Sequence, residues 1–451
     1  MAQRSMVELL MEAQRRSGEH PFAVLVWVDE SGYPMHRPAR FEVHGDTLWL
    51  HAAGGPLPPE GASVAVIISR IRPLPQGGYE GRRYWTFHGP AQHIPGGLAV
   101  RPTRATGWQE DTLPFLALCE RAVPQARRYF AHLSRTYGRA IRPRLSPLWL
   151  LVRATRFPFL SATLVPVLLG TAVAFREGVF APLPFVLALL GAACIHLGLN
   201  VVNDIFDTLS GADTMNPNPT PFSGGSRVLQ YGLLRIREMA YLAAALYGCG
   251  ILIGLLLAAM QGWEALLPLG IAGLLLSWAY TAPPLRLAYR GLGELAVAVG
   301  FGPIMTLGAY AAQTGRLGLA PLVASLPVAV LIALVLYVNE VPDREGDVAA
   351  GKRTLVARLP LHRIAWGYGI AVATAYLAIA AGVAGGWLPP VALLAGLTLP
   401  MAIAVGRDLA RAPDRPYALI TAMATQIRLH LYVGLLLAAS YFIAPWFPHN
   451  G

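Results

Sequence analysis

Nine long apolar stretches dominate the sequence after residue 145 and restrict its fold more than any other feature. Several are close to the roughly 20 residues that a helix needs to cross a bilayer. Because hydrocarbon offers the backbone no hydrogen-bond partner, such segments must form helices. The chain is 55% hydrophobic and 14% charged, with a mean hydropathy of +0.47. These features predict a polytopic, all-α membrane domain, with spans at 159–176, 181–202, 238–261, 264–280, 292–313, 319–340, 364–384, 387–406 and 429–446.

Residues 1–140 have a different character, with frequent Arg and His and only short apolar runs. Turn signals such as His44-Gly45-Asp46 separate strand-like runs, and a helical pattern covers 110–138. This part is predicted to be a soluble β-rich domain, a small barrel or sandwich. A basic, proline-containing linker at 139–144 would join it to a membrane domain at 141–451. The strand-like runs lie at 22–28, 38–43, 47–51, 63–68 and 84–94.

Two acidic clusters lie at the ends of apolar stretches. The first is Asn203-Asp204-Ile205-Phe206-Asp207, with Asp213 just beyond it, and the second is Asn339, Asp343 and Asp347. Polar groups four residues apart share one face of a helix. Carboxylates near hydrocarbon are costly and usually imply a cation. Oxygen ligands suit Mg²⁺, which recruits substrate phosphates, so the clusters predict a membrane enzyme that handles a diphosphate.

The net charge of +11 comes mostly from Arg. Nearly all Lys and Arg after the first span fall in the loops on one side of the membrane, and only Arg176 and Arg316 fall on the other. The chain is expected to be an integral protein of a bacterial-type cell membrane, and the excess predicts its orientation. Its N-terminal domain and both acidic clusters would be cytoplasmic and its C-terminus outside. Orientation and anionic headgroups explain the charge, so no nucleic-acid partner is expected.

Neither the start of the chain nor its cysteines suggest export. Residues 1–18 are amphipathic and lack an apolar h-region, so they are not interpreted as a signal peptide. Cys119, Cys194 and Cys249 have neither metal-ligand nor redox spacing. They are interpreted as packing residues in a reducing compartment.

From about residue 145 to its end, the sequence resembles the UbiA superfamily of intramembrane aromatic prenyltransferases. Asn203-Asp204-x-x-Asp207 followed by Gly211-Ala212-Asp213 looks like the first aspartate motif of that family, and Asp343-x-x-x-Asp347 looks like the second. The stretches at 280–286 and 289–294 resemble the cytoplasmic loop between them. The stretch 221–229 and the string from Asn339 to Lys352 lean toward the 1,4-dihydroxy-2-naphthoate polyprenyltransferases of menaquinone synthesis. Glu340-Val341-Pro342 departs from many of those enzymes.

The resemblance implies Mg²⁺-dependent transfer of a polyprenyl group from a polyprenyl diphosphate to an aromatic acceptor at the surface of the lipid bilayer. Arg can bind phosphate oxygens bidentately and Lys acts as a point charge. Catalytic roles are expected for Asp204, Asp207, Asp343 and Asp347. Metal ligands are expected among these four together with Asn203 and Asp213. Substrate-binding residues are expected at Asn200, Asn203, Asp213, Tyr280, Arg286, Tyr289, Arg290, Asn339, Lys352 and Arg353.

Several alternatives stay open at this point. The acceptor is 1,4-dihydroxy-2-naphthoate by the closest motifs, or else 4-hydroxybenzoate, homogentisate, a chlorophyllide or a glycerol phosphate ether. Acidic clusters also occur in cation-coupled transporters, although those carry charges near mid-span. Membrane orientation explains Arg286 and Arg290 about as well as phosphate binding does. Tyr280 and Tyr289 also fit an interfacial aromatic belt.

The first 135 residues resemble the pyridoxamine 5′-phosphate oxidase-like split barrel, a flavin- or haem-associated fold. Tyr84-Trp85-Thr86-Phe87-His88-Gly89-Pro90-Ala91 looks like a late strand of that family. The resemblance implies FMN or another flavin, although no clear phosphate-binding set stands out. A flavin-dependent quinone oxidoreductase is therefore the alternative activity for this domain.

Overall fold

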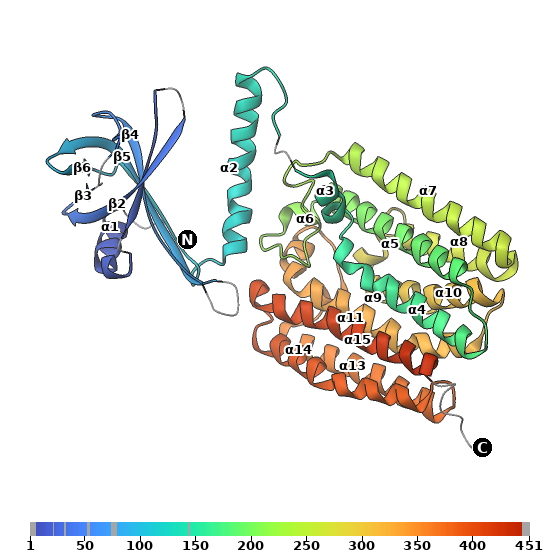
Figure 1. Cartoon of the computed structure of the whole chain (residues 1–451). Coiled ribbons are helices and arrows are strands. Elements are labelled where there is room, and N and C mark those ends of the chain that lie inside the picture. The colour runs from blue at the N-terminus through green and yellow to red at the C-terminus, as the bar shows by residue number, and fades with distance from the viewer. Residues whose placement is uncertain are drawn as a thin grey trace. The chain divides into compact units, whose positions relative to one another are not determined.

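The computed structural model describes residues 6–20, 22–30, 33–51, 55–73, 79–142 and 145–443. The chain forms two compact units, Met1–Cys119 and Glu120–Gly451. In Figure 1 the colour follows the residue number, so the strands of the first unit are blue and the last helices of the second are red. These units divide earlier in the chain than the predicted domain boundary at residue 140. The division into functional domains at that residue stays a prediction.

The first unit is an antiparallel β-sheet domain, as the sequence predicts. Its sheet has the strand order β4-β1-β2-β3-β6-β5-β7, and an additional β4–β5 pairing closes six strands into a ring. Along β1 the buried residues alternate, with Ala23, Leu25 and Trp27 inside. The strands are β1 (Ala23–Val28), β2 (Pro34–His44), β3 (Thr47–His51), β4 (Ser63–Pro73), β5 (Tyr79–Ile94), β6 (Gly97–Val100) and β7 (Arg104–Gln109).

Three elements of this unit escaped sequence analysis. Helix α1 (Met6–Arg15) precedes the sheet and buries Leu9, Leu10 and Ala13 in its core. Strand β6 is buried along its whole length and β7 has a single buried residue, so neither shows the alternating pattern by which the other strands were predicted. The predicted strand runs correspond to the other five strands, whose ends extend past several of the expected boundaries.

The second unit is helical. It includes α2 (Phe115–Thr136) from Glu120 onward, and α3 (Pro147–Ala154) precedes the first long apolar helix. The remaining helices are η2 (Phe157–Leu160), α4 (Ser161–Arg176), α5 (Pro182–Ser210), α6 (Ala212–Met215), α7 (Ile236–Gln261), α8 (Trp263–Thr281), η3 (Leu287–Arg290), α9 (Gly293–Val299), η4 (Gly300–Ile304), α10 (Met305–Thr314), α11 (Leu319–Ala349), α12 (Leu355–Arg358), α13 (Leu361–Ala384), η5 (Pro390–Thr398), α14 (Leu399–Arg411), η6 (Pro416–Leu419) and α15 (Ile420–Ile443).

Within the described residues, nine helical segments are long and apolar enough to span a membrane, which confirms the predicted number. Two of them continue beyond the expected ends. Helix α5 runs through the first acidic cluster until Gly211, whose φ of 86° ends it in a left-handed cap. Helix α11 runs through the second cluster to Ala349. The last span starts earlier than expected, at Pro416 rather than residue 429.

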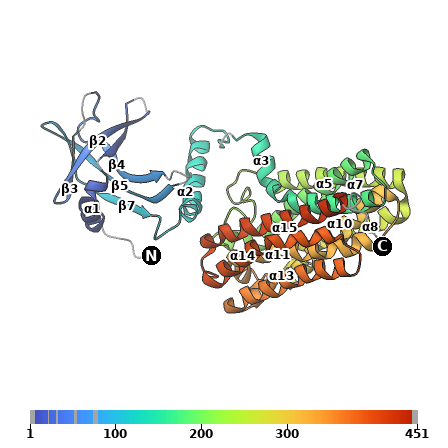
Figure 2. The same cartoon turned by 60° about the horizontal axis from the view of Figure 1, so that its bottom comes forward.

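Helices α4 and α11 lie at the centre of the bundle. Their apolar windows are 61% and 56% buried within the protein, against 22% for α7, α8 and α13. Small residues permit the close packing of α4. A Cβ at Gly170 would lie 2.2 Å from the Thr306 carbonyl oxygen, and one at Gly434 would lie 2.1 Å from Val165. Figure 2 shows α11, α13 and α15 running side by side.

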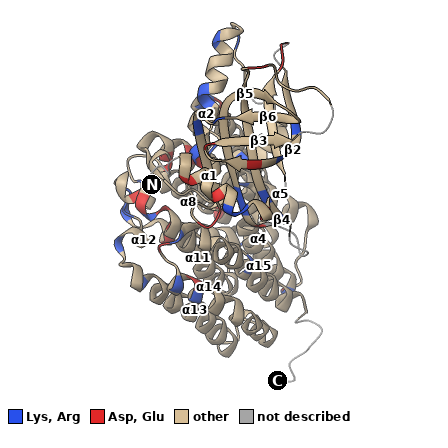
Figure 3. Ribbon diagram, turned by 90° about the vertical axis from the view of Figure 1, so that its left-hand side faces the viewer, with Lys and Arg blue, Asp and Glu red and all other residues tan. Residues whose placement is uncertain are grey.

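Charged residues gather at one end of this bundle. In Figure 3 the long helices are mostly tan, and blue and red segments lie in the loops near α12 and α14. Both acidic clusters lie near the C-terminal ends of their helices, α5 and α11. The chain is thus an integral membrane protein with its acidic clusters at a single end of the helices. The assignment of that end to the cytoplasm stays a prediction.

Candidate active site

Asp207 is the most completely bonded residue of the first cluster. Helix α5 places Asn203 and Asp207 on one face, and Asn203 Nδ2 donates to Asp207 Oδ2 at 3.1 Å. Tyr289 OH donates to Asp207 Oδ1 at 2.6 Å, and Lys352 Nζ donates to Oδ2 at 3.1 Å. The C-terminal end of a helix disfavours negative charge, so carboxylates here need cations to offset the dipole. Lys352 supplies one.

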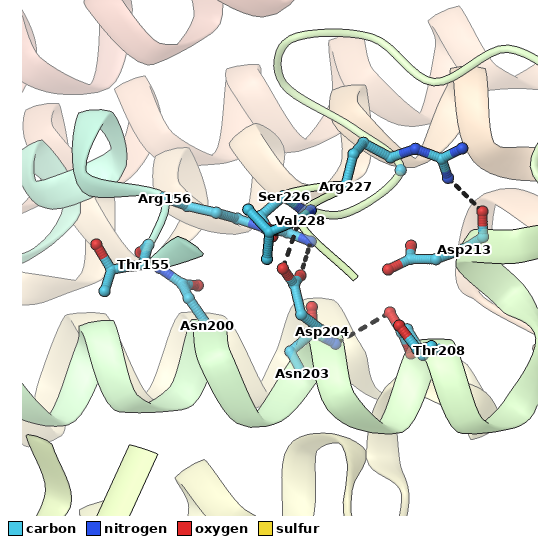
Figure 4. Close-up of polar contacts among 12 residues, drawn as sticks. Thr155, Arg156, Asn200, Asn203, Asp204, Thr208, Asp213, Ser226, Arg227 and Val228 are labelled. Atoms are coloured by element: carbon cyan, nitrogen blue, oxygen red, sulfur yellow. Dashed lines mark hydrogen bonds and ion pairs between the residues drawn. The ribbon is translucent and has the colours of Figure 1, made fainter. Parts of the chain in front are cut away.

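Asp204, the adjacent acid, contacts two other segments. Arg156 Nη2 lies 2.6 Å from Asp204 Oδ1, and the Ser226 backbone N–H donates to Asp204 Oδ2 at 3.0 Å (Figure 4). Arg156 occupies the left-handed region, with φ at 53°, immediately before η2. Burial opposes the charge of Arg156, but Asp204 and Asp213 raise the pKa of its guanidinium above the ordinary value. Arg156 therefore stays charged inside the bundle.

The second cluster lies on α11, where the four-residue spacing of Asn339, Asp343 and Asp347 puts them on one face. Asp343 accepts hydrogen bonds from Asn216 Nδ2 at 2.7 Å and from the Gly224 backbone N–H at 2.9 Å. Both donors belong to the loop that follows α6. This loop therefore contacts Asp343 on α11 and, through Ser226, the first cluster on α5.

Lys352 joins the two clusters. Its Nζ lies 3.1 Å from Asp207 Oδ2 and 3.7 Å from Asp347 Oδ1. Burial alone would lower the pKa of this ammonium group, but Asp207 and Asp347 raise it well above its ordinary value. Lys352, whose side chain is 13% exposed, lies between one acid from each helix, so the two clusters, distant in sequence, form a single group.

A polar cavity of about 130 Å³ lies between these residues. Burial first, and then the Asp207 and Asp204 carboxylates, raise the pKa of Asp213 well above its ordinary value. Four buried oxygens of the lining have no hydrogen-bond partner among the described residues, namely Asp213 Oδ2, Asn339 Oδ1, Glu340 Oε2 and Asp347 Oδ2. Unpartnered buried acceptors are costly, so this lining favours a bound cation or hydrogen-bond donor.

An apolar cavity of about 410 Å³ extends from the polar one between α5, α7, α8 and the α9–α10 region. The two cavities share five lining residues: His196, Leu199, Tyr280, Val297 and Phe301. At this junction the His196 ring packs edge-on against Phe301 at 4.7 Å, and its Nδ1 lies 2.8 Å from Thr163 Oγ1. The polar and apolar cavities are therefore adjacent parts of one binding space.

Glycine residues hollow out the apolar cavity. Seven of them line it: Gly191, Gly250, Gly254, Gly270, Gly273, Gly300 and Gly308. A Cβ at Gly254, Gly270 or Gly308 would meet no atom within 4 Å. The space exists because side chains are missing at these positions, and larger residues there would fill it.

The oxygen set fits Mg²⁺ by chemistry, although the described residues contain no ready-made metal cage. No group of three or more His, Cys, Asp or Glu side chains among them is gathered closely enough to hold an ion alone. Mg²⁺ commonly takes only one or two carboxylates and completes its shell with water and substrate phosphates. The unpartnered oxygens of Asp213, Asn339 and Asp347 could supply the protein ligands of such an ion. They come from both sides of the cavity, since Asp213 belongs to the first cluster and the other two to the second.

The structure divides the predicted site residues into two groups. Those that line the polar cavity are Asn200, Asn203, Asp207, Asp213, Tyr280, Asn339, Asp343, Asp347 and Lys352. Those outside its lining are Asp204, Arg286, Tyr289, Arg290 and Arg353. Asp204 and Tyr289 still bond to residues that line it, whereas Arg286, Arg290 and Arg353 are exposed. The predicted roles of all these residues in metal and substrate binding stay predictions.

Several lining residues carry no signal in the sequence. Arg156 precedes the first span, where positive charge is expected for orientation alone, so nothing in the pattern pointed it inward. His196 lies in an apolar run of α5 without a motif around it. Asn216 and the turn at Ser223–Gly225 belong to a loop whose Pro and Gly content indicates only irregular structure. The stretch 221–229 was noted as part of the resemblance but was given no role.

Comparisons with known proteins identify the family. Residues 163–424 match the UbiA prenyltransferase family. The chain is 30% identical over 309 residues to the 2-carboxy-1,4-naphthoquinone phytyltransferase of Synechocystis sp., covering 66% of this chain and 94% of that protein. It is 27% identical to the 1,4-dihydroxy-2-naphthoate octaprenyltransferase of Bacillus subtilis, covering 65% and 93%. A UbiA homologue from Archaeoglobus fulgidus, solved bound to GPP and Mg²⁺, is 17% identical, with a TM-score of 0.37 over 64% of this chain and 99% of that one.

Proposed function

Because the chain belongs to the UbiA prenyltransferase family and is a prenyltransferase, we propose that it transfers a polyprenyl group from its diphosphate to 1,4-dihydroxy-2-naphthoate, in menaquinone biosynthesis. One observation carries the proposal. A polar cavity lined by acids of α5 and α11 shares five residues with an apolar cavity deeper in the bundle. This combination suits a donor that has a charged diphosphate head and a long hydrocarbon tail.

The polar cavity would bind the diphosphate. Arg156 and Lys352 line it, and both are held charged by neighbouring carboxylates. Mg²⁺, held by Asp207, Asp213, Asn339, Asp343 and Asp347, would offset the charge of the diphosphate when bound. The fixed cations Arg156 and Lys352 then stabilise the negative charge that develops on the leaving group, without having to reorganise during the reaction.

The bond changes follow from this placement. The bond between the allylic carbon and the diphosphate oxygen breaks, and the diphosphate leaves with both electrons. A ring carbon of the acceptor supplies the electron pair of the new carbon–carbon bond and loses the substituent it carried, a proton or a carboxyl group as CO₂. Tyr280 and His196, which line both cavities, lie where head and tail of the donor meet. The apolar lining excludes water, which would otherwise trap the allylic cation.

The choice of acceptor rests on the relatives. One is named for a carboxylated naphthoquinone and the other for a dihydroxynaphthoate, so both act on a bicyclic ring that carries a carboxyl group. The apolar cavity would hold the tail among its glycines. The flavin expected for the N-terminal unit is no part of this proposal.

The test is an acceptor panel. Membranes containing the full-length protein would be incubated with Mg²⁺ and radiolabelled geranylgeranyl diphosphate, with 1,4-dihydroxy-2-naphthoate, 4-hydroxybenzoate, homogentisate or chlorophyllide as acceptor. We expect labelled product with the naphthoate and its loss in EDTA, and membranes lacking the protein are the control. Label appearing only in another acceptor, or equal labelling in EDTA, would overturn the proposal.

A further inference from the structure

The loop between α6 and α7, residues 216–235, holds acids of both clusters with its backbone. The Gly224 N–H donates to Asp343 Oδ2 at 2.9 Å, and the Ser226 N–H donates to Asp204 Oδ2 at 3.0 Å. Figure 4 shows the second of these contacts, with Arg156 bonded to the same carboxylate. The conformation of this short turn therefore fixes the orientation of one acid on each of two helices.

The turn has an unusual backbone that needs outside support. Gly224, Gly225 and Arg227 have φ values of 74°, 77° and 66°, all in the left-handed region. A Cβ at Gly225 would lie 2.2 Å from Asp213 Oδ2, so the chain touches that carboxylate directly. For Arg227, which has a side chain, this conformation is unfavourable and persists only if contacts enforce it. One contact is from its guanidinium to the Asp213 carbonyl oxygen (Figure 4).

The other support comes from helix α2. Arg227 Nη2 lies 3.1 Å from Glu120 Oε2, and the two side chains are only 11% and 15% exposed. Tyr231 OH donates to the other Glu120 oxygen, and Arg127 Nη1 donates to the Gln230 carbonyl oxygen at 3.1 Å. An ion pair this well shielded from water is screened less than a surface pair. Glu120 therefore binds two residues of the loop at once.

We propose that Glu120 is a positioning residue for the diphosphate site. Through Arg227 and Tyr231 it holds the turn at 224–227 in place. The backbone of that turn then orients Asp204 and Asp343. The inference rests on the proposed function: Asp343 lines the donor site, and Asp204 bonds to Arg156, which also lines it. It extends the site to α2, a helix that precedes the first span and lies outside the family match at 163–424. Sequence analysis had placed this helix in the soluble domain.

The consequence is a particular kinetic signature. Without the Glu120 carboxylate, Arg227 keeps a buried charge with a single partner, and the turn loses the restraint on its unfavourable conformation. Binding of the donor would then have to orient these acids as well, and the affinity for the donor would fall. The loss of Glu120 removes no charge from the site and acts on Asp343 only through its orientation, which is restored once the donor is bound. A defect should therefore fall on KM for the donor rather than on kcat, whereas loss of the Asp343 charge itself lowers kcat.

The experiment uses full-length protein and five variants. For Glu120→Gln we expect KM for geranylgeranyl diphosphate to rise about ten-fold, with kcat nearly unchanged, the usual effect of removing one charged hydrogen-bond partner. Tyr231→Phe, which removes one hydroxyl and should fold normally, is expected to raise KM by about three-fold. Arg128→Gln, an exposed residue of the same helix, is the matched control and should behave as wild type. The Glu120→Gln/Arg227→Gln pair should be no worse than Arg227→Gln alone, because the residues act as a unit.

Hydrogen exchange separates this inference from the proposed function. In the absence of substrates, Glu120→Gln should speed amide exchange in 222–233 and leave the span helices protected. If wild-type protein transfers no prenyl group, the proposed function fails, while the exchange result still decides the role of Glu120. Wild-type KM and wild-type exchange in folded Glu120→Gln and Tyr231→Phe would overturn the inference, as would additive effects in the double variant.

Discussion

The polar and apolar cavities of the bundle are adjacent but are built by opposite means. The polar cavity depends on side chains that are present, with five acids on its walls, Asp204 behind them, and two largely buried cations between them. The apolar cavity depends on side chains that are absent, because Gly254, Gly270 and Gly308 leave open space between the helices that surround it. The polar part should therefore be sensitive to the loss of single atoms, and the apolar part to added volume.

The difference also separates two properties of a prenyltransferase. Cleavage of the diphosphate bond should depend on the polar cavity, and the accepted tail length should depend on the apolar one. The junction residues His196, Tyr280 and Phe301 belong to both. Substitutions on the two sides of this junction should change different kinetic quantities.

The largest effect is expected from the acids themselves. Asp207→Asn and Asp343→Asn should each lower kcat by about a thousand-fold while the protein stays folded in membranes, because each removes a charge that organises the diphosphate site. Transfer assays at saturating Mg²⁺ measure this, with membrane content checked by immunoblot. Near-normal turnover in either variant would show that its cluster is not part of the site.

Lys352 is expected to matter next. It lies between Asp207 and Asp347, so Lys352→Met should lower kcat/KM by about one hundred-fold, in line with loss of a buried charged partner. Lys352→Arg keeps the charge and should recover part of the activity. Steady-state kinetics with a varied donor concentration would measure kcat/KM for both variants. Equal loss in both variants would point to shape rather than charge.

A smaller effect with a different signature is expected from filling the apolar cavity. Gly308→Leu adds volume where no atom lies within 4 Å, so kcat/KM should fall about ten-fold for a long-tailed donor and little for geranyl diphosphate. The matched control is Gly369→Leu, the same change at an exposed position of α13 that also has no atom within 4 Å. A uniform loss across donor lengths in Gly308→Leu would contradict a tail-binding role for this cavity.

The smallest effect is expected from the exposed arginines. The sequence predicts that Arg286 and Arg290 bind the diphosphate, but the structure leaves both exposed and outside the polar cavity. Exposed charges contribute little, so each Arg→Lys change should alter KM by less than about five-fold. Donor titrations measure this, and protease protection of the loops checks that topology is unchanged. A large rise in KM would bring these arginines into the site.

Much of the fold was predictable because its signals are local. A run of about 20 apolar residues identifies a span without knowledge of its neighbours. The spacing of Asn203 and Asp207 on α5, and of Asn339 and Asp343 on α11, is likewise a property of one helix. The acids were found from that spacing, and the structure brings both clusters to one cavity.

The rest depends on contacts between distant parts of the chain. Arg156 turns toward Asp204, 48 positions later, and Glu120 contacts Arg227, 107 positions later. Neither pairing leaves a pattern in the sequence, because Arg before a span and Glu on an amphipathic helix are ordinary features there. The helix ends were misjudged for a related reason, since α5 and α11 continue through polar residues whose partners come from other segments.

The central claim, that the acids of α5 and α11 form one donor site, is tested most directly by binding. Full-length wild type, Asp207→Asn, Asp343→Asn and the double variant would be titrated with a non-hydrolysable geranylgeranyl thiolodiphosphate in the presence and absence of Mg²⁺. One shared site predicts that each single variant loses Mg²⁺-dependent binding and that the double variant is no weaker than either. Retention of Mg²⁺-dependent binding in one single variant, or additive losses in the double variant, would contradict it.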